Sequence, residues 1–183
     1  MDVVETEWWT MALAPEWWAD VEEDGTVLVA DEDDVGCLEM TTLHKTDGQL
    51  TPAELKQIAV TESPSVPAWK AVNCGDFRGF TASFSEAEAA VREWYLASGG
   101  LLLFVSYSCD LDNRGMDDAA VDALLDTGTL SSADGAGDAH PLGTLDRPGL
   151  QGVLAAFDMS VDKVFTGDHQ PGEDECARRQ YGQ

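Results

Sequence analysis

The stretch that decides the fold is Val91-Arg-Glu-Trp-Tyr-Leu-Ala-Ser-Gly-Gly-Leu-Leu-Leu-Phe-Val-Ser-Tyr107. Its second half, from Leu101, is almost continuously apolar, which is typical of a strand covered on both faces. Its first half carries Trp94 and Leu96 and also reads as a strand. The break at Ser98-Gly-Gly100 is short enough for a hairpin turn. The pattern therefore predicts two paired antiparallel strands, the second of them central in its sheet.

Working outward, short apolar or alternating segments separated by turn residues predict further strands. Asp24-Gly25 is a hairpin signal, and the run Asp31-Glu-Asp-Asp34 marks a second exposed turn. The predicted strands are Trp8 to Leu13, Trp17 to Glu22, Thr26 to Ala30, Cys37 to His44 and Phe77 to Phe84. The segment 85–90 fits either a loop or one helical turn.

Two segments predict helices. Thr51-Pro-Ala-Glu54 is a capping box, with Thr51 as N-cap and Pro52 at the first helical position, so a helix should run to about Val60. The second helix should cover Met116 to Leu125, whose apolar residues fall on one face. With the strands, these helices indicate an α+β domain in which a central antiparallel sheet is flanked by helices.

The chain has 183 residues, enough for one domain with a hydrophobic core. We assign residues 1–130 to a single α+β domain. Composition shifts afterwards, and residues 131–183 are expected to form a linker (Ser131 to Pro148), a short helix (Leu150 to Phe165) and a loose tail (Thr166 to Gln183).

Charge is the most unusual property of the sequence, with 35 acidic against 10 basic residues and a net charge of −25. Hydrophobic content of 44% indicates that this charge lies on a folded surface. Such a surface repels nucleic acid phosphates and anionic lipid, so we expect neither direct nucleic acid binding nor membrane binding. The charge instead favours a partner protein with a basic surface. The alternative is that the charge serves only solubility.

The N-terminus lacks the pattern of a secretory signal, and no apolar run has the length of a membrane span, so we expect a cytoplasmic protein. The four cysteines are widely separated and show no CxxC pair or metal-ligand spacing. They are therefore expected to be reduced thiols, and the residues concerned are Cys37, Cys74, Cys109 and Cys176.

Catalytic motifs are missing from the sequence. The three histidines, His44, His140 and His169, do not lie in a recognisable nucleophile setting, and no P-loop or G-x-G-x-x-G is present. We therefore predict no catalytic residues, no metal ligands and no cofactor. Pairs of carboxylates suited to acid and base chemistry are uninformative among so many acidic residues.

Two groups of residues are candidates for partner binding. The acidic turn Asp31, Glu32, Asp33 and Asp34 concentrates negative potential and could bind a basic partner, and the alternative is an ordinary solvated turn. In the pairs Trp8-Trp9 and Trp17-Trp18, neighbouring side chains of a strand point to opposite faces, so each pair places one indole in the core and one outside it. Trp9, Trp17 and Trp18 are taken as candidates because exposed tryptophan is enriched at interface hot spots. The alternative is that a flanking helix covers both faces.

The order of elements resembles small bacterial proteins of the PsbP/Mog1-like fold superfamily over residues 5–127. The resemblance rests on Pro15-Glu-Trp-Trp18, Leu50-Thr-Pro-Ala-Glu-Leu55, Gly75-Asp-Phe-Arg-Gly79, Arg92-Glu-Trp-Tyr-Leu96 and Leu102-Leu-Phe-Val-Ser-Tyr107. It implies an α/β/α sandwich and a binding protein, since members include photosystem subunits, a partner of a small GTPase, and accessory proteins of secreted toxins. It brings no shared catalytic residues.

We therefore expect a non-catalytic protein-binding domain, such as an immunity or accessory protein that masks a basic surface on a toxin or effector. The alternative is a small-ligand or metal-binding domain with hydrolytic activity. That alternative predicts a concave pocket lined by convergent polar groups.

Overall fold

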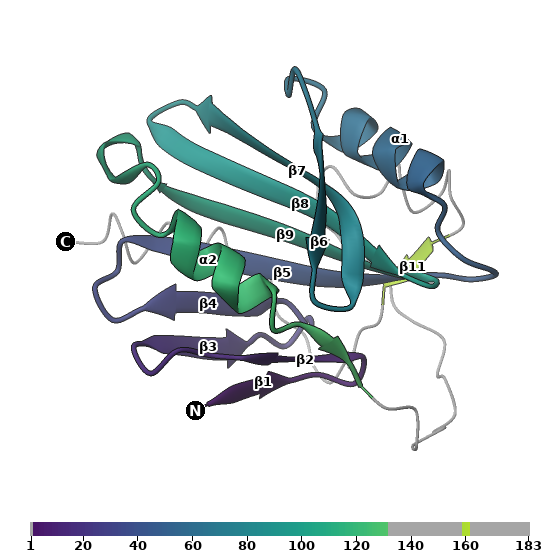
Figure 1. The fold of residues 1–183 in the computed structure, drawn as a ribbon, viewed down its shortest axis with the longest axis horizontal. Helices are drawn as coiled ribbons and strands as arrows, with labels where there is room; N and C mark the ends of the chain where they lie inside the picture. The colour runs from purple at the N-terminus through teal and green to yellow at the C-terminus, as the bar shows by residue number, and fades with distance from the viewer. Residues whose placement is uncertain (1, 132–158, 162–183) are drawn as a thin grey trace.

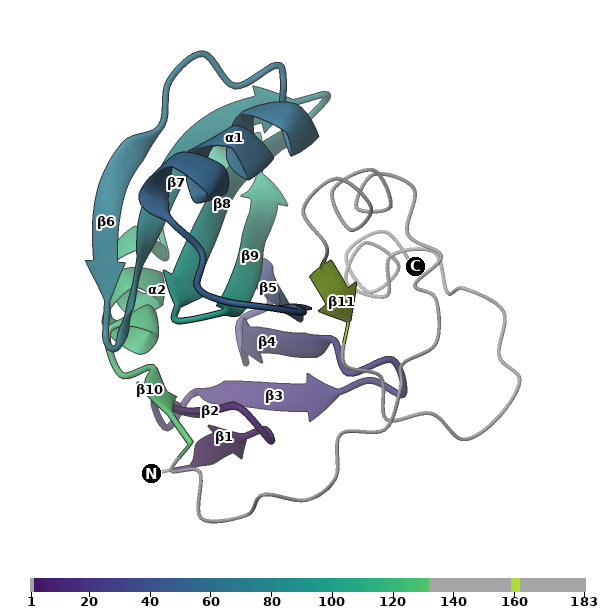
Figure 2. The ribbon, with the colours of Figure 1, turned by 90° about the vertical axis from the view of Figure 1, so that its right-hand side faces the viewer.

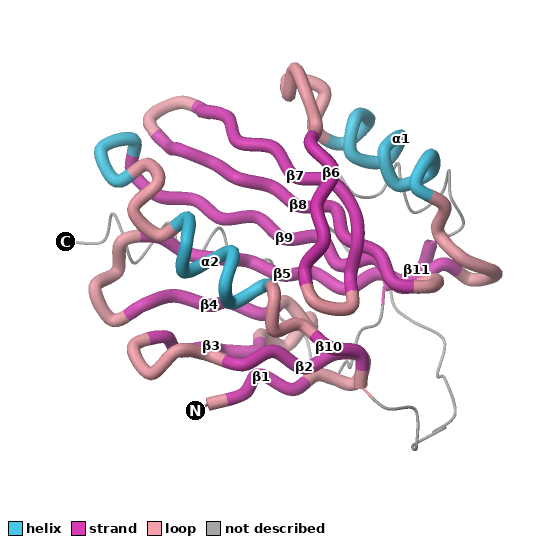
Figure 3. Tube along the Cα trace, viewed as in Figure 1, coloured by secondary structure: helices cyan, strands magenta, loops and turns pink. Residues whose placement is uncertain are grey.

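The main feature of the fold is one large antiparallel β-sheet. The computed structural model describes residues 2–131 and 159–161, and strands, drawn in magenta in Figure 3, are the main secondary structure among them. The strands of the large sheet are all antiparallel to their neighbours. Their spatial order is β3 (Trp17–Val21), β4 (Val27–Asp31), β5 (Gly36–Lys45), β9 (Leu101–Asp110), β8 (Ala89–Ser98), β7 (Phe77–Glu86) and β6 (Lys70–Cys74).

The central hairpin predicted from the sequence is confirmed. β8 and β9 pair along their whole length, and the pair Ser98 and Leu101 closes the turn at Gly99-Gly100. β9 lies between β8 and β5, so it is interior in the sheet. The segment 85–90, left open between a loop and a helical turn, is instead a hairpin in which Glu86 pairs with Ala89.

A second, three-stranded sheet consists of β1 (Val3–Glu5), β2 (Trp9–Ala12) and β10 (Thr129–Leu130), with β2 in the middle. The sequence predicts the Trp8 to Leu13 strand but does not separate it from the strands of the central sheet. Within the described residues, it pairs with the segments 3–5 and 129–130, from the two ends of the domain. Pairing over such a distance in the chain leaves no local sequence signal.

The two faces of the large sheet bury different clusters. On one face, the main core includes Trp94 and Val105, and it is covered by the small sheet and by α2 (Asp118–Leu125). On the other face, Tyr95 and Leu102 pack beneath α1 (Pro52–Glu62). Figures 1 and 2 show the two helices on opposite sides of the large sheet. The predicted α+β domain with a central antiparallel sheet agrees with this, although the small sheet, and not helices alone, covers the face that carries α2.

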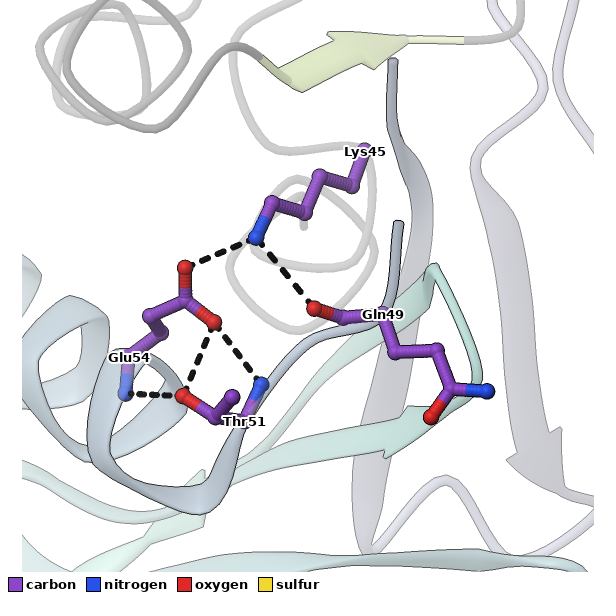
Figure 4. Close-up of polar contacts among 4 residues, drawn as sticks. All are labelled: Lys45, Gln49, Thr51 and Glu54. Carbon is purple, nitrogen blue, oxygen red and sulfur yellow. Dashed lines mark hydrogen bonds and ion pairs between the residues drawn. The ribbon is translucent and has the colours of Figure 1, made fainter. Parts of the chain in front are cut away.

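The capping box of α1 is confirmed (Figure 4). The Thr51 hydroxyl accepts a hydrogen bond from the Glu54 amide at 3.2 Å, and the Glu54 carboxylate accepts one from the Thr51 amide at 2.8 Å. Lys45 at the end of β5 donates to the same carboxylate at 2.7 Å. The hydrogen bond from Lys45, followed by those from Thr51, lowers the pKa of Glu54 to about 2. The charged cap therefore joins α1 to β5.

The C-terminal predictions are tested at one point. Residues Met159–Val161 form strand β11, which pairs with Leu43–Lys45 of β5, so the helix expected over Leu150 to Phe165 is wrong there. The rest of that segment, the linker before it and the tail after it lie outside the described residues. The second predicted helix is confirmed but begins at Asp118 rather than Met116.

Candidate functional site

One end of the large sheet gathers acidic side chains from separate parts of the chain. The β4–β5 turn, the end of β9, the 3-10 turn η1 (Leu111–Asn113) and the start of α2 all lie at the left of Figure 1. Gly36, after the turn, pairs with Cys109 near the end of β9. This pairing brings the acidic turn, residues 31–34, beside residues far along the chain.

Tyr107 connects these segments. Its hydroxyl donates a hydrogen bond to a carboxylate oxygen of Asp117 at 2.6 Å, next to the N-terminus of α2. Burial, together with this bond to a carboxylate, raises the pKa of Tyr107, so the phenol stays protonated and acts as a donor. Its ring passes directly over Gly36, where an added Cβ would lie 2.1 Å from the hydroxyl oxygen. Glycine is therefore required beneath Tyr107.

The carboxylates at this end influence one another. Burial raises the pKa of Asp31, and repulsion from Asp117 and Asp33 adds to the rise, although backbone hydrogen bonds oppose it. Burial raises the pKa of Cys109 too, and the carboxylates of Asp117, Asp110 and Asp118 add to the rise. We call this set the acidic end, and it comprises Asp31, Glu32, Asp33, Asp34, Asp110, Asp117 and Asp118.

Backbone contacts hold the acidic turn in place. The Asp31 carboxylate accepts a hydrogen bond from the Val35 amide at 3.3 Å, and the Glu32 amide donates to the Glu16 carbonyl at 2.9 Å. Asp34 has a φ of 55°, in the left-handed region that aspartate tolerates better than most residues. With the backbone held in this way, the side chains of residues 32–34 are exposed to solvent.

Arg92 on β8 binds α2 and neutralises part of its charge. The guanidinium contacts Asp118 at 3.0 Å and Asp122 at 2.8 Å, and it lies over the Trp94 ring at 4.5 Å. Only 16% of its side chain is exposed. This cation serves the packing of α2, while the outer carboxylates of the acidic end point to solvent.

A pocket of about 230 Å³ adjoins the acidic end. Arg92, Tyr107, Cys109, Ser85 and Arg114 are among the residues that line it. The Arg114 guanidinium hydrogen bonds to the Ser85 hydroxyl. Because burial raises the pKa of Cys109, its thiol is protonated near neutral pH and is a poor nucleophile. The pocket presents polar groups to a small molecule, including Asp118 and the Arg92 guanidinium that binds it, without an activated nucleophile among the groups named here.

The tryptophan candidates are divided by burial. As predicted, each pair places one indole inside: Trp9 is 0% and Trp17 is 5% exposed, while Trp8 and Trp18 are partly exposed. The Trp8 ring contacts the His44 ring in a tilted arrangement, with ring centroids 4.0 Å apart and an interplanar angle of 57°. Trp9 and Trp17 therefore belong to the core, and their assignment to a partner-binding surface is corrected. Trp18 remains a candidate, one residue beyond Trp17, which pairs with Asp31 across the β3–β4 hairpin.

Sequence reasoning found the acidic turn but missed the residues beside it. No pattern in the sequence groups Asp110, Asp117 and Asp118 with the acidic turn, and Arg92 and Tyr107 lie in segments predicted as strands. Their proximity depends on the pairing of β5 with β9, which no local pattern specifies. Among the described residues, no group of three or more His, Cys, Asp or Glu side chains is arranged to hold a metal ion.

The cysteines differ from the expectation of reduced thiols. Cys37 is disulfide-bonded, whereas Cys74 and Cys109 are free and buried. Cys176 lies outside the described residues, as do His140 and His169. Because disulfides persist mainly in oxidising compartments, the state of Cys37 bears directly on where the protein resides.

Alkylation tests the thiol assignment. In the native protein at neutral pH, we expect Cys74 and Cys109 to resist iodoacetamide, because burial protects both thiols and raises the pKa of Cys74 to about 11. After unfolding without reductant, both should be labelled, and Cys37 should be labelled only once a reductant is added. Peptide mass spectrometry reads each site. Labelling of Cys37 without reductant would contradict the disulfide and restore the expectation of reduced thiols.

Comparisons with known proteins supply no family. No family model matches the chain, and no curated protein does. A crystal structure of a protein from Bacteroides thetaiotaomicron VPI-5482 has a TM-score of 0.49 and 14% identity, covering 69% of this chain and 46% of that one. This chain therefore spans less than half of that protein. LpqN, described as involved in cell envelope biogenesis of Mycobacterium tuberculosis, has a TM-score of 0.48 and 16% identity, covering 68% and 83%.

Likenesses at this level carry no argument about function. Neither structure is described as PsbP/Mog1-like, so that resemblance stays a prediction. Within residues 2–131 and 159–161, no helix is both long and apolar enough to span a bilayer.

Proposed function

We propose that the protein is a non-catalytic protein-binding domain whose acidic end binds a basic surface on a partner. The observation that carries the proposal is the convergence of carboxylates from the β4–β5 turn, the end of β9 and the start of α2, with residues 32–34 exposed. Complementary charge would accelerate association and select against acidic partners. Partly exposed Trp18 lies close enough along β3 to supply an aromatic contact.

The partner class follows from the charge. A toxin or effector that acts on nucleic acid or another polyanion needs a basic surface, and an acidic protein that covers this surface would act as an immunity or accessory protein. The PsbP/Mog1-like resemblance favours the same class. A cytoplasmic location stays a prediction, and the Cys37 disulfide argues against it. The small-ligand alternative also stays a prediction, and the pocket beside Arg92 and Arg114 is where it would apply.

Charge-neutral variants at the acidic end test the proposal. The substitutions Glu32→Gln, Asp33→Asn and Asp34→Asn remove three exposed carboxylates. A matched control, Glu5→Gln, Glu7→Gln and Glu23→Gln, removes three exposed carboxylates elsewhere. In quantitative pull-downs from the native host, we expect the acidic-end variant to recover roughly tenfold less partner, and the control to recover wild-type amounts. Recovery should also fall with added salt.

Two results would contradict the proposal. One is equal loss of partner with both variants, which would mean that only net charge matters. The other is the absence of any partner that depends on residues 32–34.

A further inference from the structure

The strand β7 is longer than its outer neighbour β6. β6 pairs with β7 from Cys74, opposite Phe77, to Lys70, opposite Thr81. The remaining residues of β7, Ala82 to Glu86, pair with β8 on the inner side only. We call this stretch the β7 edge.

The register shows which backbone groups of the β7 edge are unpaired. The two-residue turn at Gly75-Asp76 makes Cys74 and Phe77 a hydrogen-bonded pair, so alternate residues from Phe77 onward direct their N–H and C=O groups outward. The two-residue turn at Ala87-Glu88 likewise makes Glu86 and Ala89 a hydrogen-bonded pair, so Glu86 and every second residue before it direct their main-chain groups towards β8. Both place the main-chain groups of Ser83 and Ser85 on the outer edge. No described residue hydrogen bonds to these groups there.

The β7 edge lacks the features that usually protect an exposed strand. Ser83 and Ser85 are exposed, and the stretch contains no proline, no lysine and no positive φ. Both serines also line the pocket beside Arg114, so side chains of an added strand would have space on that face. Four unpaired main-chain groups at this edge therefore form a template for strand addition.

The negative charge of this protein indicates which kind of strand could bind at the β7 edge. Two copies of a chain with a net charge of −25 would repel each other, which disfavours pairing of two β7 edges. The face of β7 towards α1 carries Glu86, and Glu93 on β8, opposite Ala82, faces the same side and accepts a hydrogen bond from the Ser63 hydroxyl at 2.5 Å. Lysine side chains on an added strand would lie near the Glu86 carboxylate, with Glu93 one strand further into the sheet.

We propose that the β7 edge binds an extended, lysine-bearing segment of the partner, which adds a strand to the large sheet through the main chain of Ser83 and Ser85. The inference rests on the proposed function for the charge of the partner. It adds a second contact surface, separate from the acidic turn, and a binding mode in which main-chain hydrogen bonds provide affinity and lysines provide selectivity.

The probe is a short peptide that alternates lysine and threonine, with blocked ends. Hydrogen exchange in the free protein should show fast exchange at the amides of Ser83 and Ser85 and protection at Phe84, which faces β8. Adding the peptide should shift the NMR signals of the Ser83 and Ser85 backbone amides and slow the hydrogen exchange of these amides. The same peptide N-methylated at every residue keeps its charge but loses its donors, and it should leave these signals unchanged.

Substitutions at one position separate the backbone from the side chain. Ser85→Pro removes an outward N–H without breaking the ladder to β8, and Ser85→Ala keeps the amide while removing the hydroxyl. We expect Ser85→Pro to weaken peptide binding roughly three- to tenfold, and Ser85→Ala to stay within about twofold of wild type. The variant Glu32→Gln/Asp33→Asn/Asp34→Asn should also bind the peptide at the β7 edge within about twofold.

Several results would overturn the inference: protection of Ser83 and Ser85 in the free protein, no response of their signals to the peptide, equal response to the methylated peptide, or equal affinity of Ser85→Pro and Ser85→Ala. If the inference fails while partner capture still depends on residues 32–34, the proposed function stands without it. If the peptide binds the β7 edge but capture does not depend on residues 32–34, the proposed function fails instead.

Discussion

Gly79→Ala is expected to destabilise the domain by about 3 kcal/mol or more, one of the largest effects of any single substitution in this chain. An alanine Cβ at this position would lie 1.8 Å from the carbonyl oxygen of Tyr95 and 2.8 Å from its carbonyl carbon. These are backbone atoms of β8, so a rotamer change cannot relieve the overlap. Gly79 is also paired on both sides, with Leu96 and with Val72, so β7 cannot move away without disturbing both ladders.

Urea unfolding measures this effect, and Gly99→Ala is the matched control. Gly99 lies in the β8–β9 turn with a φ of 60°, and an added Cβ would meet nothing within 4 Å. Its substitution should cost only the strain of a left-handed residue, about 1 kcal/mol. If Gly79→Ala costs less than Gly99→Ala, the close approach of β7 to β8 described above is wrong.

Trp9→Ala is expected to cost about 3 to 5 kcal/mol, because the indole is completely buried between the small sheet and the large one. Trp9 lies on β2, and its indole nitrogen donates a hydrogen bond to the Thr42 hydroxyl on β5 at 2.9 Å. Removing the ring would leave a large cavity in the main core and would remove a contact that joins the two sheets. The melting temperature should fall accordingly.

Two control variants separate the contributions. Thr42→Val removes only the hydrogen-bond acceptor and should cost about 1 kcal/mol. Trp18→Ala, on the partly exposed side of β3, should cost less than Trp9→Ala. If Trp9→Ala instead kept full stability in urea and lost partner binding, Trp9 would have to return to the partner-binding surface, where the sequence first placed it.

Local patterns accounted for much of the fold. The apolar run after Gly100, the turn at Asp24-Gly25 and the capping box at Thr51 each specify a local structure through contacts between neighbours in the chain. The structure confirms all three. The pairs of tryptophans likewise followed the two-residue period of a strand, so one member of each pair had to be inside. Which faces of the sheet are covered, and by what, required the structure.

Contacts between distant segments escaped prediction. β2 joins β1 and β10 in a separate sheet because its partners come from both ends of the domain, and the two residues of β10 are too few for a recognisable strand pattern. β11 was read as part of a helix because a short apolar segment fits both helix and strand. The disulfide of Cys37 was missed because spacing alone does not predict cysteine pairing.

Composition alone established that this protein presents an acidic surface and lacks recognisable catalytic motifs, since charge and motifs are properties of the chain itself. Only the pairing of β5 with β9 decided that the carboxylates of residues 31–34 meet those of Asp110, Asp117 and Asp118. The unpaired length of β7 depends in the same way on where β6 ends. The periodicity of side chains is a local property of the sequence. Which strands pair, in which register, and where a strand is left unpaired depend on contacts between residues far apart in the chain.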